Sequence, residues 1–206
     1  MSINSKVELC NMALGHCGIT GSVNNIDSPS NSKEVTFSLW YDIVRQNLLK
    51  ALIPNFAIKR DTVAKIVETP KFGYQYVYAA PSNSIRLLGV GDIEDKLDQR
   101  ISYESGKIYT DDLWDGGMQV RFVEDVTDVT RFTPEFKHLF SLELASVTCL
   151  PLTQSLEKKA MVDKQLVAYR QSASGINAQE NPPIRRSESR FRAARNMDVA
   201  RNASKK

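Results

Sequence analysis

The sequence contains little histidine and cysteine, with two His and three Cys among its 206 residues. A zinc site needs several such ligands at short spacing, and no second pair of ligands accompanies His16 and Cys17. Cys10 and Cys17 are seven apart in a helical pattern, which separates their Cα atoms by about 10 Å and excludes a disulfide between them. Because Cys149 also lies in an apolar run, we expect all three cysteines to be small core residues. We expect no metal site and no cofactor.

The chain also lacks a long apolar run. No run approaches the ~20 residues that a membrane helix needs, and the N-terminal stretch MSINSKVELCNMALG is polar and acidic where a signal peptide is apolar. The hydrophobic content of 42% is enough to build one large or two small cores. We therefore expect a soluble protein that is made and used without secretion.

Basic charge is scarce in most of the chain and concentrated at its C-terminal end. The last 22 residues, 185–206, hold eight of the 27 Lys and Arg residues and two of the 24 Asp and Glu residues. The preceding 184 residues therefore carry 19 basic against 22 acidic side chains, a net charge of −3. A body without a basic surplus argues against a dedicated nucleic-acid-binding domain. The tail remains a candidate segment for binding nucleic acid or another protein.

Motifs that carry catalysis are also missing. The stretch LLGVGDIE contains GxG after a predicted strand, but it lacks the third glycine and the following helix of a dinucleotide loop, so we interpret it as a turn. His138 could pair with Cys149 or a serine, yet no nucleophile elbow surrounds any candidate. The acidic pairs Asp111-Asp112 and Glu94-Asp95 fall in predicted turns, where a solvated role is more common than acid–base catalysis. We expect no active site, and an enzyme is the weakest of three alternatives.

Two helices are predicted at the start of the chain. Ser5 and Glu8 form a capping-box pattern that begins a helix ending at Gly18, and a second helix runs from about Asn31 or Ser32 to Pro54. We expect residues of this helical frame, such as Trp40 and Phe136, to lie in the core. The apolar positions of the second helix form one wide stripe: Leu39, Trp40, Ile43, Val44, Leu48, Ala51 and Leu52.

Two further helices are predicted after residue 130. Thr133, Pro134 and Glu135 combine a cap, a first-turn proline and an acidic residue at the positive end of the helix dipole. This third helix is apolar on most sides, which indicates burial among other helices, and Pro151 is expected to break it. A fourth helix, at about 155–173, places apolar residues on one face: Val162, Leu166, Tyr169 and Ala173.

The segment between these helix pairs has the pattern of strands. The stretches YQYVYA, IRLLGV, QRISYE, KIYT and MQVRFVE are short, β-branched or aromatic, and predict four or five antiparallel strands between about 72 and 125. Ser105-Gly106 predicts a tight hairpin, and Asp115-Gly116-Gly117 predicts the next turn.

The predicted fold class is α+β. Residues 1–71 and 130–175 would form an antiparallel bundle of about four helices, and residues 72–129 a small antiparallel β-rich insertion. Residues 176–206 would form an extended basic C-terminal arm.

Several stretches resemble one family in order and spacing along the chain. NFAIKRDTVAKI followed by FGYQYVYAAPSNSIRLLGV resembles the passage from the second helix into the sheet of the head-to-tail adaptors of tailed phages, a group often called tail tubular protein A. GKIYTDD and MQVRFVEDVTDVTRFTPEFKHLFSLELASVTCLPLTQS resemble the sheet exit and third helix of the same family, and SASGINAQENPP resembles its run-out into a C-terminal arm. The resemblance extends from about residue 3 to 183.

The resemblance implies a structural protein of the virion. Such adaptors form a closed homo-oligomeric ring, typically of twelve copies, between the portal and the tail tube or nozzle, with genomic DNA passing through the lumen without sequence-specific contact. The helical bundle makes the ring, the β region projects toward the tail, and the C-terminal arm reaches the portal or a neighbouring subunit. The implied location is the neck of the virion, and the host cytoplasm during assembly, with no membrane contact.

The C-terminal tail is the candidate binding segment. Residues 187–201 could form a short helix, because Glu188 lies four before Arg192 and Asp198 three before Arg201, but so short a helix would need a partner surface to become ordered. Arginine pairs with carboxylates as well as phosphates, and Phe191 is the kind of aromatic anchor that protein interfaces favour. We expect the tail to dock onto the portal or a neighbouring subunit. Two alternatives stay open: the tail contacts DNA, which would make the chain a DNA-binding protein, or it is merely solvated. The candidate partner-binding residues are Arg185, Arg186, Arg190, Phe191, Arg192, Arg195 and Arg201.

Overall fold

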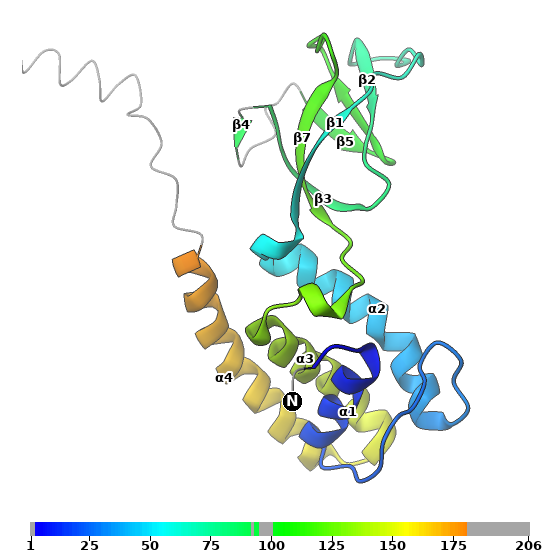
Figure 1. The fold of residues 1–206 in the computed structure, drawn as a ribbon, viewed down its shortest axis with the longest axis vertical. Helices are drawn as coiled ribbons and strands as arrows, with labels where there is room; N and C mark the ends of the chain where they lie inside the picture. Colours follow the sequence, from blue (N-terminus) through cyan, green and yellow to red (C-terminus); the bar gives the residue numbers. More distant parts are fainter. Residues whose placement is uncertain (1–2, 92, 95–100, 181–206) are drawn as a thin grey trace, which may run out of the picture.

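The computed structural model describes residues 3–91, 93–94 and 101–180, and this part of the chain has an α+β fold. The molecule is elongated, with its helices gathered at one end and its strands at the other (Figure 1). The helices are α1 (Lys6–His16), α2 (Ser32–Leu52), α3 (Pro134–Thr153) and α4 (Leu156–Glu180), with short 3-10 turns at Asn55–Ala57 and Val129–Arg131. The strands are β1 (Ile58–Val63), β2 (Tyr76–Ala79), β3 (Ser84–Val90), β4 (Ile93–Glu94), β5 (Ile101–Glu104), β6 (Lys107–Thr110) and β7 (Met118–Glu124).

Side-chain caps begin the first three helices where the sequence predicted them. Ser5 Oγ accepts the backbone N–H of Glu8, and the Glu8 carboxylate accepts the backbone N–H of Ser5, so the predicted capping box is confirmed. Asn31 at α2 and Thr133 at α3 each accept the N–H of the residue three positions later. These caps stabilise the helix starts because the first N–H groups of a helix have no intrahelical partner.

Two helix ends differ from the prediction. The prediction that Pro151 breaks the third helix is wrong, because α3 continues to Thr153 before Gln154 caps it in the left-handed conformation. Pro151 has no N–H, so the helix loses one backbone hydrogen bond there. The loss is tolerated because Pro151 lies in the last turn of α3. Helix α4 continues to Glu180, so residues 176–180, predicted to be part of the extended arm, are helical. No proline interrupts this stretch before Pro182, so its backbone can continue in the helix.

Helix α3 is the centre of the helical end, since α1, α2 and α4 each pack against it. The predicted burial of Phe136 is confirmed, and Phe136 and Phe140 are both in the core. The ring of Phe140 meets that of Tyr41 of α2 edge to face with centroids 5.0 Å apart, and Phe136 meets Phe56 in the same way at 5.1 Å. Such pairs contribute ~0.5–1.5 kcal/mol beyond the burial of their area.

The sheet region begins earlier than predicted. Strand β1 lies within residues 1–71, which were assigned to the helical bundle, and it pairs antiparallel with β7 along its whole length, from Ile58 opposite Val123 to Val63 opposite Met118. The full order of this sheet is β1-β7-β3-β4. Strand β1 is an edge strand with four exposed residues in succession, so it shows no alternation of apolar and polar residues.

The second sheet has the order β2-β6-β5 and contains the predicted hairpin. Glu104 pairs with Lys107, which leaves Ser105 and Gly106 as a two-residue turn, with φ values of 50° and 73°. Two successive positive φ values are what a type I′ hairpin turn requires. The predicted hairpin is confirmed, and the strands between 72 and 125 are antiparallel as predicted, although the described residues of this range form six strands rather than four or five.

Strand β7 joins the two ends of the molecule. Its Val123 is buried in the helical core, whereas the adjacent Phe122 is buried in the core between the sheets, as the alternation of a strand requires. Beyond the strand, the buried guanidinium of Arg45 of α2 donates to Val126 O at 3.0 Å and pairs with Asp125. The passage from sheet to helices is therefore fixed by packing and by a buried charge pair.

Candidate assembly surfaces

The seven partner-binding residues predicted in the arm lie outside the described residues. The structure describes the chain up to the end of α4 at Glu180, next to the first residues of the arm. The role of Arg185, Arg186, Arg190, Phe191, Arg192, Arg195 and Arg201 stays a prediction.

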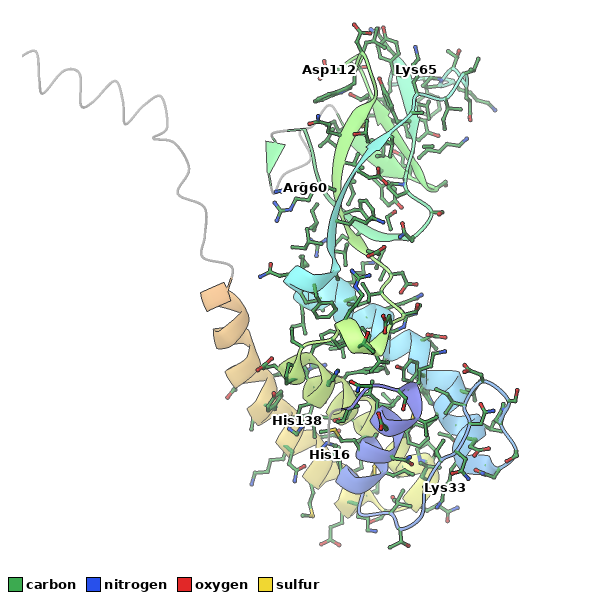
Figure 2. All side chains as sticks on the ribbon, in the orientation of Figure 1. His16, Lys33, Arg60, Lys65, Asp112 and His138 are labelled. Atoms are coloured by element: carbon green, nitrogen blue, oxygen red, sulfur yellow. The ribbon has the colours of Figure 1, made fainter. Side chains whose placement is uncertain are left out.

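The closest approach to a catalytic pair lies among α1, α3 and α4. His16 Nε2 is 3.0 Å from the hydroxyl of Ser141, and the rings of His16 and His138 are edge to face at 5.4 Å (Figure 2). Ser141 is fully buried and donates its own proton to His138 O at 2.8 Å, so its hydroxyl accepts a hydrogen bond from His16. A nucleophilic serine needs the opposite arrangement, with its proton directed to the histidine. This contact therefore holds helices together.

A shallow hollow of about 400 Å³ adjoins these histidines and is lined also by Leu142, Gln165, Ala168 and Tyr169. The Tyr169 ring packs edge to face on His138 with centroids 4.4 Å apart. Burial and the neighbouring His138 lower the pKa of His16, so the fold favours the neutral form of His16.

The three cysteines are buried and unpaired, which confirms the prediction that they are core residues. Burial raises the pKa of Cys10 and of Cys17 to about 12, so both thiols stay protonated at neutral pH. Among the described residues, no three His, Cys, Asp or Glu side chains are grouped as metal ligands would be. No described helix combines the length and the apolar character needed to cross a membrane.

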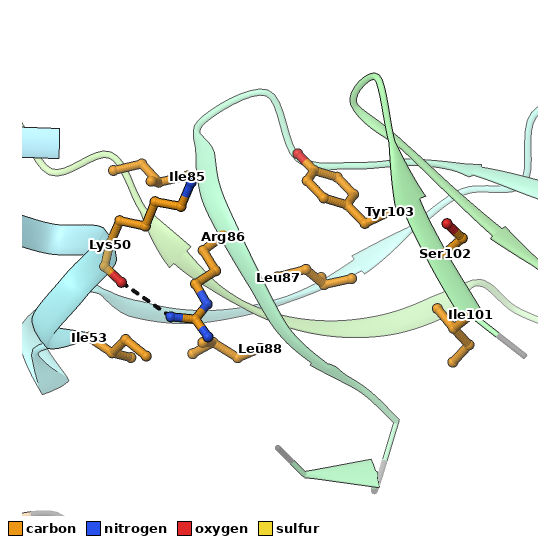
Figure 3. Close-up of a pocket in the computed structure, with 9 residues that line it drawn as sticks. All are labelled: Lys50, Ile53, Ile85, Arg86, Leu87, Leu88, Ile101, Ser102 and Tyr103. Carbon is orange, nitrogen blue, oxygen red and sulfur yellow. Dashed lines mark hydrogen bonds between the residues drawn. The ribbon is translucent and has the colours of Figure 1, made fainter. Parts of the chain in front are cut away.

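A larger hollow, of about 540 Å³, lies between the end of α2 and strands β3 and β5 (Figure 3). Arg86 donates to the backbone oxygen of Lys50 at 3.3 Å across this hollow, and Ser102 and Tyr103 lie on its far wall. The described lining residues include neither a carboxylate nor a histidine. The remaining lining residues are apolar: Ile53, Ile85, Leu87, Leu88 and Ile101.

Helix α2 has an exposed apolar face that the sequence interpretation placed in the core. Trp40 is 37% exposed, Ile43 50% and Leu39 65%, so the prediction of a buried Trp40 is wrong. The helix carries two separate apolar lines. Phe37, Tyr41, Val44 and Leu48 pack into the helical core, whereas Val35, Leu39 and Ile43 follow one another at intervals of four on the side away from it. This second line is the signal that sequence reasoning missed.

Helix α4 also exposes apolar residues on the side away from α3. Val162 and Leu166 are buried and Tyr169 is partly buried, as the predicted face required, whereas Leu156, Met161 and Val167 are exposed. The side chain of Ala173 lies outside the part that the structure describes. Leu150, near the end of α3, adds a further exposed apolar residue.

The β end exposes large apolar residues in its loops. Val67 is fully exposed and Phe72 is 88% exposed in the segment between β1 and β2, and Leu113 is exposed in the turn between β6 and β7. Lys65 and Asp112, which belong to the same two segments, lie at the end of the molecule farthest from the helices (Figure 2).

No known protein-family model matches the chain, and no curated protein matches it.

Proposed function

We propose that this chain is a structural virion protein, a head-to-tail adaptor of a tailed phage. Copies of the chain would form a ring, of twelve subunits by the resemblance described above, between the portal and the tail tube or nozzle. Genomic DNA would pass through its lumen. In this proposal the protein acts at the neck of the virion, after assembly in the host cytoplasm.

The observation that carries the proposal is the exposure of large apolar side chains at both ends of an elongated molecule. At the helical end these residues lie on α2 and α4, and at the β end Val67 and Phe72 are exposed in the segment between β1 and β2. A chain that stays alone in water gains nothing from such surfaces, whereas a subunit that bridges two partners needs one at each end. This two-ended arrangement supports an adaptor.

The charge distribution supports a channel through which DNA passes without being bound tightly. Residues 1–184 carry a net charge of −3, and a dense basic lining would hold DNA through phosphate contacts. We propose no catalytic role, because the closest His–Ser contact, between His16 and Ser141, is buried and has its protons directed the wrong way for catalysis.

The proposal assigns the basic arm to portal binding or to a neighbouring subunit. Purified full-length chain, alone and mixed with the portal protein of the same phage, is imaged by electron microscopy and weighed by native mass spectrometry. We expect a closed ring that seats on the portal. Deletion of residues 184–206 should weaken portal binding by about tenfold or more, because several charged contacts and one aromatic anchor are lost together.

Two results would count against this assignment. Undiminished portal binding by the truncated chain would remove the role of the arm, and a full-length chain that neither forms a ring nor binds the portal would remove the adaptor role. The tail charge also favours a second candidate, a DNA-binding protein. Micromolar affinity for duplex DNA, with a steep salt dependence that the truncation abolishes, would favour that candidate.

A further inference from the structure

Helices α2 and α4 lie on opposite sides of α3, and each exposes an apolar face on the side away from α3 (Figure 1). We propose that neighbouring copies of this chain pair through these two faces, with α2 of one copy against α4 of the next. The inference rests on the proposed ring and names the surfaces that would build it.

The face on α2 is a line within the first 12 of the 21 residues of the helix. Val35, Leu39 and Ile43 occur every four residues, with Trp40 at the edge of the line, and all four are exposed. In the last third of the helix the same side carries Gln46 and Lys50 instead. We name the four residues Val35, Leu39, Trp40 and Ile43 the α2 face.

The face on α4 is longer but less continuous, because Asp163 and Lys164 lie between its residues. Leu156, Ala160 and Val167 lie along one side of the helix, with Met161 at its edge, and all four are exposed. We name these four residues the α4 face. The small Ala160 leaves room for a larger side chain of a partner, whereas the α2 face consists of large side chains.

Charged residues of both signs border the two faces. Asp42 borders the α2 face with 66% of its side chain exposed, although it also pairs with Arg45. Glu157 and Lys164 are both exposed on the outward side of α4. A contact of α2 with α4 can pair Asp42 with Lys164, whereas a contact between two α2 faces would bring two copies of Asp42 together.

The position of the faces determines what kind of assembly results. A symmetric dimer would use one patch twice, whereas two different patches on opposite sides of one chain allow each copy to bind two neighbours head to tail. Such contacts close into a ring when the rotation between copies closes. A second copy is therefore the occupant that satisfies both faces at once.

The size of the faces implies weak single contacts. Helix α2 has 21 residues and is ~31 Å long, and its apolar line covers only part of that length. A stable interface usually needs ~800 Å² from each partner, which is more than one such line supplies. Each copy in a closed ring is held at both faces, so the ring is far more stable than an isolated pair.

The experiment uses full-length variants in which one face is spoiled. Leu39→Glu with Ile43→Glu spoils the α2 face, and Met161→Glu with Val167→Glu spoils the α4 face. Glutamate keeps helix propensity, and the exposed positions make folding tolerant of the change. Ala79→Glu is the control, since it adds a glutamate at an exposed residue of strand β2, outside both helical faces. Circular dichroism and the thermal midpoint verify that each variant is folded.

Analytical ultracentrifugation and native mass spectrometry then give the oligomeric state over a range of concentrations. We expect concentration-dependent rings or chains for the wild type and for the control, and monomers for each spoiled variant alone. An equimolar mixture of the two spoiled variants should form at most a heterodimer, and only at high concentration, because each variant brings one intact face and the single contact is weak.

Three results would overturn the proposed pairing. They are a wild type that stays monomeric at every concentration, a spoiled variant that still self-associates, and a mixture that forms assemblies larger than a dimer. A ring that survives both changes and still binds the portal would leave the adaptor role intact while excluding this interface. Pairing as expected without any portal binding would instead exclude the adaptor role alone.

Discussion

Gly117 sets how closely strand β7 can approach the edge strand β1. Its φ is +104°, and a Cβ at this position would lie 2.7 Å from Thr62 Cγ2 and 3.1 Å from Val63 O. The adjacent Gly116 has a φ of +85°, and no described atom lies within 4 Å of the position of its Cβ. The two glycines therefore share the backbone constraint but differ in the space around them.

Replacing either glycine with alanine should cost stability, with a larger cost at Gly117. A left-handed conformation costs an L-residue ~1–2 kcal/mol, and this term applies to both variants. At Gly117 the methyl group of Thr62 must also leave its rotamer, which adds ~0.5–1.5 kcal/mol. We therefore expect Gly117→Ala to lower the free energy of unfolding by about 1 kcal/mol more than Gly116→Ala.

Urea unfolding followed by tryptophan fluorescence and circular dichroism measures both losses. Thr62→Ser removes the methyl group that a new Cβ would meet, so the double variant Thr62→Ser with Gly117→Ala should recover most of the extra loss. Thr62→Ser with Gly116→Ala serves as the control and should show no such recovery. Equal losses at the two glycines, or an extra loss at Gly117 that Thr62→Ser leaves unchanged, would refute the steric reasoning.

Two further predictions concern ionisable groups. The buried carboxylate of Glu34 accepts N–H groups of the preceding loop and the hydroxyl of Ser30, which lower its pKa to about 2. The ionised carboxylate therefore contributes its full stability above its ordinary pKa of 4.5, and this contribution is lost as the pH falls toward 2. At pH 7, Glu34→Gln should unfold at a lower urea concentration than the wild type, and the difference between their urea midpoints should narrow in acid. A difference that stays constant with pH would contradict this. Burial lowers the pKa of His16 in the folded protein below its ordinary value of 6.5. Neutral His16 therefore contributes its full share to folding stability above pH 6.5, and this contribution is lost as the pH falls through the lowered pKa. His16→Gln, which keeps a donor for Ser141, should flatten the fall of the thermal midpoint between about pH 7 and 5, and an unchanged profile would exclude His16 as its source.

The starts of the helices could be predicted because their determinants are local. The cap of α1 needs Ser5 and Glu8 within one turn, and the cap of α3 needs Thr133 and Pro134 side by side. The hairpin at Ser105-Gly106 is local in the same sense, since two residues fix the turn. In each case the interacting groups lie within a few residues of one another, so the sequence shows them together.

Strand β1 could not be predicted because its determinant is distant. Its sequence IKRDTV carries three charged residues in succession, Lys59, Arg60 and Asp61, which fit an exposed edge but no apolar alternation. The segment is a strand because β7, beginning at Met118, offers it a row of backbone partners. Charged side chains on an edge strand also hinder its pairing with the strands of other chains. The same charges that concealed the strand in the sequence therefore protect the edge of the sheet from aggregation.

Of the candidate assembly surfaces, only the basic arm could be predicted from the sequence. The basic arm stands out in the sequence, and its role stays a prediction because residues 181–206 lie outside the described part. The α2 face does not stand out, since a helix that is apolar on two sides can turn either side toward a neighbour. The structure decides between them: Tyr41 and Phe37 pack into the helical core, and Leu39 and Ile43 face water.

The place where the described chain ends relates the arm to the α4 face. The arm follows α4, which carries one of the two proposed assembly faces, so it begins on the side of the molecule that a neighbouring copy would occupy. The 26 residues from 181 to 206 can span at most roughly 85 Å when fully extended, enough to cross a neighbouring helical end. Because residues 1–184 carry a net charge of −3 and residues 185–206 hold six more basic than acidic side chains, a neighbouring copy in the proposed ring would attract the arm. Contact of the arm with a neighbour would tighten the weak pairing of the helical faces, so deleting residues 184–206 should raise the concentration at which rings form as well as weaken portal binding.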